Sequence, residues 1–137
     1  MGPTMIIGDL TIWNRALQGY LPSLQSLFTD LRQRGELTAP PLVFAQLLAE
    51  CEDERKAERL RTWATEATPV DSNVYAWLAA GDLCHLLATH GVRLSLIDGY
   101  LATLCLREDC RLWSFNPAFE QAASLVPLRR FEPSGMR

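Results

Sequence analysis

The sequence predicts an α/β domain of three layers, in which a mainly parallel central sheet of four to five strands is flanked by helices. Short apolar runs alternate along the chain with longer segments whose apolar residues recur at helical spacing. Glycine and proline stand at many of the boundaries between them. A helix between two strands lets those strands run parallel, so the alternation favours a parallel sheet. With 137 residues, of which 48% are hydrophobic, the chain suits one domain with a substantial core.

The expected strands are short apolar runs. We predict strands at residues 4–8, 36–39 and 111–115, a weaker one at 125–128, and a strand or a simple connector at 68–70.

The expected helices carry apolar residues at intervals of three and four. They cover residues 21–31, 42–48, 54–66, 74–88 and 95–105. Gly35 and Gly91 stop two of them, and Pro40-Pro41 suits the first turn of another. Asp71 or Ser72 is expected to cap the helix at 74–88.

The composition narrows the class of protein. The formal net charge is −3, which does not indicate a general nucleic-acid binder. The chain contains no apolar run of the roughly 18 residues that a membrane helix needs, and no secretory signal is expected at its start. The cysteines form no CxxC pair, and neither histidine is spaced from them like a zinc ligand, so we expect reduced thiols in the cytoplasm. The four are Cys51, Cys84, Cys105 and Cys110.

The cationic residues are almost all arginines. Lys56 is the only lysine, and arginine supplies the rest of the 13 cationic side chains. Arginine suits bidentate phosphate contacts, although a compositional bias of the source would produce the same pattern.

Three places combine side chains that could bind a hard cation. One is Asp9 with Thr11, which follow the first strand. Another joins Asp98 at a helix start to Ser114 and Asn116 at a strand end. Carboxylate, hydroxyl and amide oxygens are the ligands that Mg²⁺ and Mn²⁺ prefer. The remaining place is the stretch 46–50 on the helix after Pro40-Pro41.

Each place also has a purely structural explanation. Asp9 is suited to cap the following helix, and Ser95 with Asp98 matches a capping box. Asn116-Pro117 is a common turn starter. His85 lies on an apolar stripe and suits the core or its boundary, and the charges of residues 50–58 suit a solvated helix face.

Four segments in order resemble the motifs of the PIN domain, the fold of the VapC-type toxin ribonucleases of bacterial toxin–antitoxin pairs. They are residues 6–13 (IIGDLTIW), 38–48 (TAPPLVFAQLL), 91–103 (GVRLSLIDGYLAT) and 112–119 (LWSFNPAF). The resemblance covers about residues 5–131, so we expect one PIN-like domain over residues 1–131 and a flexible tail at 132–137.

The resemblance implies that the chain cuts RNA with Mg²⁺ or Mn²⁺. Asp9 and Asp98 would be the metal-binding acids, and Asn116 and Gln46 would complete the catalytic set. Thr11 and Ser114 match the polar residues that accompany the family's acids. It also implies RNA as partner, a small antitoxin protein, and a homodimer. The arginines expected to hold RNA are Arg15, Arg32 and Arg34.

Gln46 departs from the family pattern, because it stands where a glutamate is usual. The chain is therefore either a metal-dependent ribonuclease or a degenerate PIN module that binds RNA or a protein with little or no cleavage. Glu50 lies one helical turn beyond Gln46, so it could stand in through a water. A flavodoxin-like or receiver-like domain is disfavoured, because it would want paired acids after the first strand or a phosphate-binding loop.

Overall fold

The computed structural model describes residues 4–19, 21–70 and 73–133 and has a three-stranded parallel sheet at its centre. The strands are β1 (Ile6–Gly8), β2 (Leu37–Thr38) and β3 (Arg111–Trp113), in the order β2-β1-β3. In the register, Ile6 pairs with Leu37 on one side and with Arg111 on the other. All three residues of β1 are buried, as expected for a central parallel strand covered on both faces.

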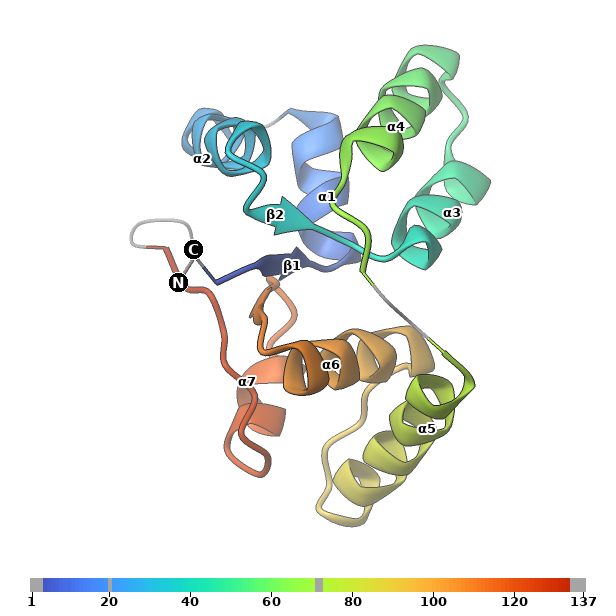
Figure 1. The fold of residues 1–137 in the computed structure, drawn as a ribbon, viewed down its shortest axis with the longest axis vertical. Coiled ribbons are helices and arrows are strands. Elements are labelled where there is room, and N and C mark those ends of the chain that lie inside the picture. Colours follow the sequence, from blue (N-terminus) through green and yellow to red (C-terminus); the bar gives the residue numbers. More distant parts are fainter. Residues whose placement is uncertain (1–3, 20, 71–72, 134–137) are drawn as a thin grey trace.

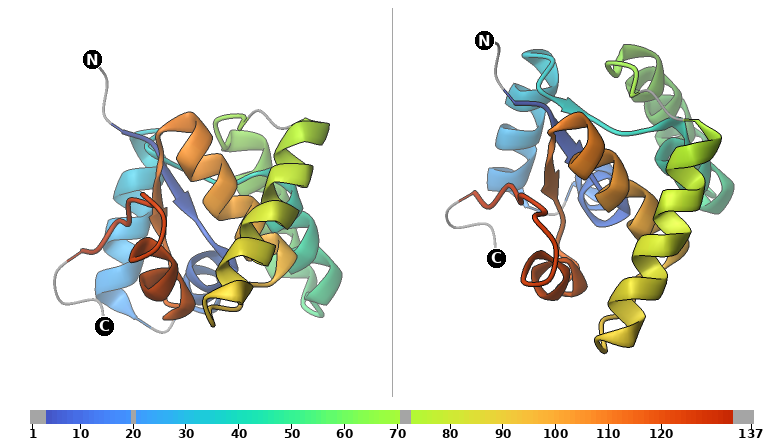
Figure 2. Two further views of the ribbon diagram at one scale, coloured as in Figure 1. Left: turned by 90° about the horizontal axis from the view of Figure 1, so that it is seen from below. Right: turned by 60° about the horizontal axis from the view of Figure 1, so that its bottom comes forward.

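Helices cover both sides of this sheet. Figure 1 shows α1, α2, α3 and α4 on one side of the strands and α5, α6 and α7 on the other. In both views of Figure 2, β1 runs between α2 and α6. The helices are α1 (Leu10–Gln18), α2 (Pro22–Gln33), α3 (Pro41–Glu50), α4 (Glu54–Glu66), α5 (Val74–Thr89), α6 (Leu96–Glu108) and α7 (Ala118–Ala123). The expected layered α/β architecture is therefore confirmed.

The expectation of four to five strands is wrong for the described residues, which form three. The segment 125–128 is not a strand: Pro127 has no N–H to give to a ladder, and the N–H groups of Leu125 and Val126 donate to Ala122 O at the end of α7. The chain meets β3 only afterwards, through an isolated bridge between Leu112 and Arg130. Residues 68–70 are a connector, which Thr38 Oγ1 holds by a 2.6 Å hydrogen bond to Thr68 O.

The helix boundaries follow local chemistry. Pro41 opens α3 and Ser95 caps α6, as the sequence predicts. The cap of α5 is Asn73, whose side chain accepts hydrogen bonds from Tyr75 N and Ala76 N. The sequence assigned this role to Asp71 or Ser72, which lie outside the described residues, as does most of the expected tail.

The core has an aromatic centre beneath α1. Trp13 packs edge-on against Phe28 and Phe44, with ring centroids 5.0 and 4.9 Å apart, and Trp63 of α4 contacts the same group. Such pairs contribute about 0.5–1.5 kcal/mol each beyond the area they bury. On the other side of the sheet, Trp77 of α5 stacks on Tyr100 of α6 at 4.0 Å. These contacts fix α1 and α6, the two helices that carry Asp9 and Asp98 at their starts.

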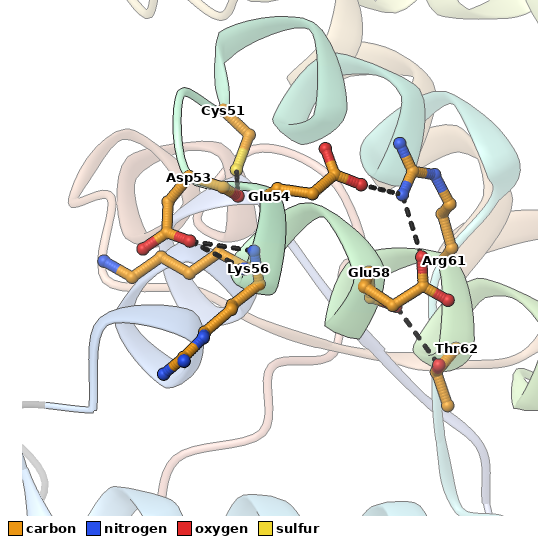
Figure 3. A network of polar contacts seen from close by, with 8 residues as sticks. Cys51, Asp53, Glu54, Lys56, Glu58, Arg61 and Thr62 are labelled. Atoms are coloured by element: carbon orange, nitrogen blue, oxygen red, sulfur yellow. Dashed lines mark hydrogen bonds and ion pairs between the residues drawn. The ribbon is translucent and has the colours of Figure 1, made fainter.

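The charged run at residues 50–58 is mostly solvated, as expected, but it spans the end of α3, a non-helical junction and the start of α4 instead of one helix face. Figure 3 shows Asp53 capping the helix through Arg55 N and Lys56 N, and Arg61 bridging two glutamates of the same helix. These groups are largely exposed, so the ion pairs contribute little to stability. Within the described part of the chain, no helix is both long and apolar enough to span a bilayer.

Candidate functional site

Asp9 lies at the carboxyl end of β1 and is almost completely buried, with 1% of its surface exposed. Trp13 of α1 packs closely against the preceding residue, Gly8. Its Nε1 donates to Gly8 O at 3.0 Å, and a Cβ on residue 8 would lie 2.8 Å from that nitrogen. The backbone of Asp9 still belongs to the sheet, because its N–H donates to Trp113 O at 3.0 Å. The side chain is therefore fixed from both neighbouring elements, β3 and α1.

Three donors hold the Asp9 carboxylate. Thr11 Oγ1 and Ile12 N donate to Oδ1 at 2.5 and 3.1 Å, and Ser114 Oγ donates to Oδ2. The bond from Ile12 is a helix N-cap, so the capping role of Asp9 is real. Capping uses only Oδ1, however, and Oδ2 accepts from Ser114, which directly follows the neighbouring strand β3. Thr11 extends the network, since its hydroxyl accepts from Phe115 N at 3.0 Å.

Asp98 stands in the first turn of α6 and reaches the same strand end through Asn116. Asn116 Nδ2 donates to Asp98 Oδ2 at 3.2 Å, and Asn116 Oδ1 accepts from Ala118 N at 3.0 Å. A backbone N–H needs an acceptor and a carboxylate needs a donor, so these bonds fix the orientation of the amide. Asn116 consequently presents its NH₂ group to Asp98 and positions that carboxylate.

The two acids share an environment that disfavours their charged forms. Burial raises the pKa of Asp9, opposed by the hydrogen bonds from Ser114, Thr11 and Ile12, and the nearby charge of Asp98 raises it further. Burial also raises the pKa of Asp98, against hydrogen bonds involving Ser95 and Asn116. Neither acid has an ion pair with any residue in the described ranges.

The donor set fits one weakly held hard cation. Buried charges in proteins are paired with an opposite charge or coordinate a metal. Among the described residues, no cationic side chain pairs with the buried Asp9 or the half-buried Asp98. Mg²⁺ is commonly held by one or two carboxylates and keeps several waters. Among the described residues, no three His, Cys, Asp or Glu side chains gather closely enough to hold a metal ion, so Asp9 and Asp98 would act without a third acid.

Gln46 makes its recorded side-chain contact along its own helix. Its Nε2 donates to Glu50 Oε1 at 2.7 Å. Glu50 is exposed and lines a separate hollow between α1 and the junction of α3 with α4, together with Lys56 and Asp53. Gln46 is thus paired with Glu50, and among the described residues neither side chain hydrogen-bonds to Asp9, Thr11 or Ser114.

The three arginines expected to hold RNA lie in different places. Arg15 of α1 is exposed, and its guanidinium lies over the ring of Phe115, 4.9 Å from the ring centre, directly beside the site. Arg32 pairs with Glu66 and Arg34 with Asp30 and Glu36. Residues 32–36 lead into the start of β2, so Arg32 and Arg34 lie at the opposite edge of the parallel sheet from Asp9.

Sequence reasoning missed two residues beside the site. Phe115 lies between Ser114 and Asn116 and contacts Arg15, a pairing that separation along the chain does not reveal. Cys84 of α5 packs against Gly99, where an added Cβ would overlap with its Sγ, and the charge of Asp98 contributes to the raised pKa of the thiol. The glycine directly after Asp98 was the only signal in the sequence for this close approach.

The fold and site together define an α/β domain with a pair of acids at the carboxyl edge of a parallel sheet. No protein-family model matches the chain, and no curated protein matches its sequence. Several solved structures share its fold.

The structure of VapBC2 from Rickettsia felis bound to a DNA fragment from their promoter matches with a TM-score of 0.73 and 16% identity, over 93% of this chain and 99% of that one. DNA-bound VapBC from Salmonella typhimurium matches with a TM-score of 0.75 and 15% identity, over 95% and 98%. FitAcB from Neisseria gonorrhoeae matches with a TM-score of 0.67 and 18% identity, over 96% and 100%. At these identities the likeness concerns the fold, and it confirms the expected VapC-like architecture.

Proposed function

We propose that this chain is a divalent-metal-dependent endoribonuclease of the VapC-like toxin class, which hydrolyses RNA phosphodiesters. The observation that carries the proposal is the environment of Asp9. Its carboxylate is buried, and burial and the charge of Asp98 raise its pKa. No cationic side chain of the described residues neutralises it. A cation-binding role explains why two acids are held together at some cost to the metal-free protein.

In this proposal Asp9 and Asp98 hold Mg²⁺ or Mn²⁺. When bound, such an ion supplies an acidified water and neutralises charge that builds up on the phosphodiester. Thr11 and Ser114 keep the Asp9 carboxylate in one orientation, and Asn116 does the same for Asp98. Gln46 would add an uncharged oxygen, because its bond to Glu50 is made by Nε2 and does not occupy Oε1.

The remaining roles concern the surroundings of the site. Arg15 is the arginine best placed to contact the RNA. The solved VapBC structures that share the fold support a small antitoxin protein as partner. A homodimer and a cytoplasmic location complete the proposal. The homodimer rests on the sequence resemblance, and the cytoplasmic location rests on the pattern of the cysteines.

One observation favours a second candidate function. The described site contains two acids without a third. A site with fewer charges binds divalent ions more weakly and activates water less well. The alternative is therefore a degenerate PIN module, which binds RNA or a partner protein with little or no cleavage.

Cleavage of RNA in the presence of Mn²⁺ separates the two candidates. The purified chain is incubated with a structured RNA beside the variants Asp9→Asn and Gln46→Glu, and products are resolved on a denaturing gel. The ribonuclease proposal expects cleavage by the wild type that Asp9→Asn removes. Cleavage by Gln46→Glu alone would reject it in favour of the degenerate module. Arg59→Ala, an exposed change on α4, serves as the control for preparation quality.

A further inference from the structure

A hollow of about 480 Å³ opens beside the residues that hold the two acids. The turn after β3 forms one wall, through Ser114, Phe115 and Asn116, and α1, α7 and the chain after Arg130 form the others. Ser114 and Asn116 are the residues that hold Asp9 and Asp98. The volume lies within the roughly 300–1,000 Å³ typical of pockets for small ligands. A group in this hollow would therefore adjoin whatever the acids bind.

The hollow contains a flat cation, the guanidinium of Arg15. The Arg15 guanidinium lies over Phe115, and Arg15 makes no ion pair with any residue that the structure describes. Nucleobases in single-stranded RNA stack on aromatic rings and on guanidinium planes. The pair formed by Arg15 and Phe115 offers both surfaces in one place.

The other charges of the hollow point to recognition of a base edge. Arg130 pairs with Glu132 at 3.0 Å, which leaves Arg15 and Glu120 as the charged groups without an ion pair to described residues. One cation and one anion give little net attraction for a phosphate backbone. A carboxylate does accept hydrogen bonds from the amino groups of adenine, cytosine and guanine, whereas uracil has no amino group.

We propose that this hollow binds one nucleobase of a single-stranded RNA, stacked on the Arg15–Phe115 pair, with Glu120 favouring a base that carries an amino group. The inference rests on the proposed ribonuclease function, because the base belongs to the nucleotide next to the phosphodiester at Asp9 and Asp98. A protein segment is the competing occupant. RNA is favoured for two reasons. The Arg15–Phe115 pair offers a flat surface for a base and Glu120 offers an acceptor for its edge, and the hollow shares Ser114 and Asn116 with the site.

The test is a metal-free measurement of RNA affinity. Fluorescein-labelled oligo(A) and oligo(U) are titrated with the full chain in EDTA, and Kd is obtained from fluorescence anisotropy. We expect oligo(A) to bind more tightly than oligo(U). Phe115→Ala should weaken oligo(A) binding on the order of tenfold, as loss of a stacking platform does elsewhere. Tyr75→Ala removes an exposed aromatic ring from α5, away from the hollow, and should leave Kd unchanged.

Further variants separate stacking from charge and from folding. Arg15→Lys keeps the charge and loses the plane, so it should weaken oligo(A) binding. Glu120→Gln brings an NH₂ group that can donate to uracil, so it should reduce the preference for oligo(A). Phe115→Leu keeps apolar volume without the aromatic face and should resemble Phe115→Ala if stacking is responsible.

Equal Kd values for the wild type, Phe115→Ala and Arg15→Lys would overturn the inference. Binding of a labelled poly-glutamate peptide that depends on Phe115, without such dependence for RNA, would assign the hollow to a protein partner and also overturn it. Failure of the proposed function appears differently, as a wild type that binds oligo(A) through Phe115 and does not cleave. A wild type that cleaves at a rate unaffected by Phe115→Ala would retain the function and reject the subsite.

Discussion

Ser114 donates a hydrogen bond to Asp9 across the sheet, and it joins residues that are 105 positions apart in the chain. The register of β1 and β3 makes this contact, because Gly8 pairs with Trp113 and the two polar residues follow directly. Ser114 also accepts a hydrogen bond from Asn116 N at 2.9 Å. The Ser114 hydroxyl therefore couples Asp9, which caps α1, to Asn116, which holds Asp98. A slip of one residue in the pairing of β1 with β3 would separate Ser114 from Asp9.

Ser114→Ala should destabilise the metal-free protein by about 1–3 kcal/mol, because it removes a donor from a buried carboxylate. It should also raise the pKa of Asp9 further, since the hydrogen bond from Ser114 lowers it. Urea denaturation measures the first effect, and carboxyl-carbon NMR titration of Asp9 measures the second.

Ser124→Ala is the matched control for this prediction. Ser124 is exposed, follows the last residue of α7 and donates to Gln121 O of that helix at 2.6 Å, so its loss should change stability little. Equal stability losses for the two serine variants, or an unchanged pKa of Asp9 in Ser114→Ala, would contradict the role assigned to Ser114.

Much of this arrangement was predictable from sequence, and the reasons for the rest are local. Asp9, Asp98 and Asn116 were identified because each follows or begins a regular element whose period is readable. Phe115 was missed because its partner Arg15 lies on another element. The strand expected at 125–128 failed because the expectation gave too little weight to Pro127, which lacks an N–H donor. It also failed because apolar composition does not reveal that α7 takes up the neighbouring N–H groups. The orientation of the Asn116 amide depends on Ala118 N, which sequence cannot place.

Gln46→Glu should slightly destabilise the metal-free chain. It replaces the 2.7 Å hydrogen bond to Glu50 with a like-charge pair one helical turn apart, which costs about 0.2–0.5 kcal/mol. If position 46 completes the metal site, Mn²⁺ should reverse this loss, and the double variant Gln46→Glu/Glu50→Gln should bind Mn²⁺ as well as the single one does. Thermal unfolding with and without Mn²⁺ measures both. A Mn²⁺ response equal to that of the wild type would remove position 46 from the site.

Gly99→Ala should destabilise the chain by about 1–3 kcal/mol, because the new Cβ would overlap with Cys84 Sγ and lie 3.2 Å from Ala80 O. Adding Cys84→Ala to Gly99→Ala should restore part of the lost stability. Gly81→Ala is the control in the neighbouring helix: nothing lies within 4 Å of its added Cβ, so it should stabilise α5 by about 0.5–1 kcal/mol. Denaturant midpoints of the four proteins check the prediction. Equal effects of the two glycine changes would show that α5 and α6 do not meet closely at Gly99.

The stability of the metal-free protein should fall as the pH rises from 3.8 towards neutrality. The pKa values of Asp9 and Asp98 are both raised above 3.8 in the folded chain, so the folded state binds protons more tightly than the unfolded state in this window. The contribution is fully present below pH 3.8 and is lost as the pH rises through the folded pKa values.

Asp98→Asn is the comparison for this pH prediction. Its amide oxygen can still accept from Asn116 but cannot ionise, so its free energy of unfolding should fall less over the same window. The difference between the two curves reports the Asp98 carboxyl group together with the part of the raised Asp9 pKa that the charge of Asp98 causes. Parallel curves for the wild type and Asp98→Asn would contradict a raised pKa at this position.

Binding of Mn²⁺ to the purified chain tests the central claim most directly, and isothermal titration calorimetry at neutral pH measures it without any substrate. The account predicts one ion per chain for the wild type and loss of that binding in both Asp9→Asn and Asp98→Asn, with circular dichroism showing that the variants stay folded. Wild-type Mn²⁺ binding that persists in both variants would contradict the claim, and so would the absence of binding by the wild type.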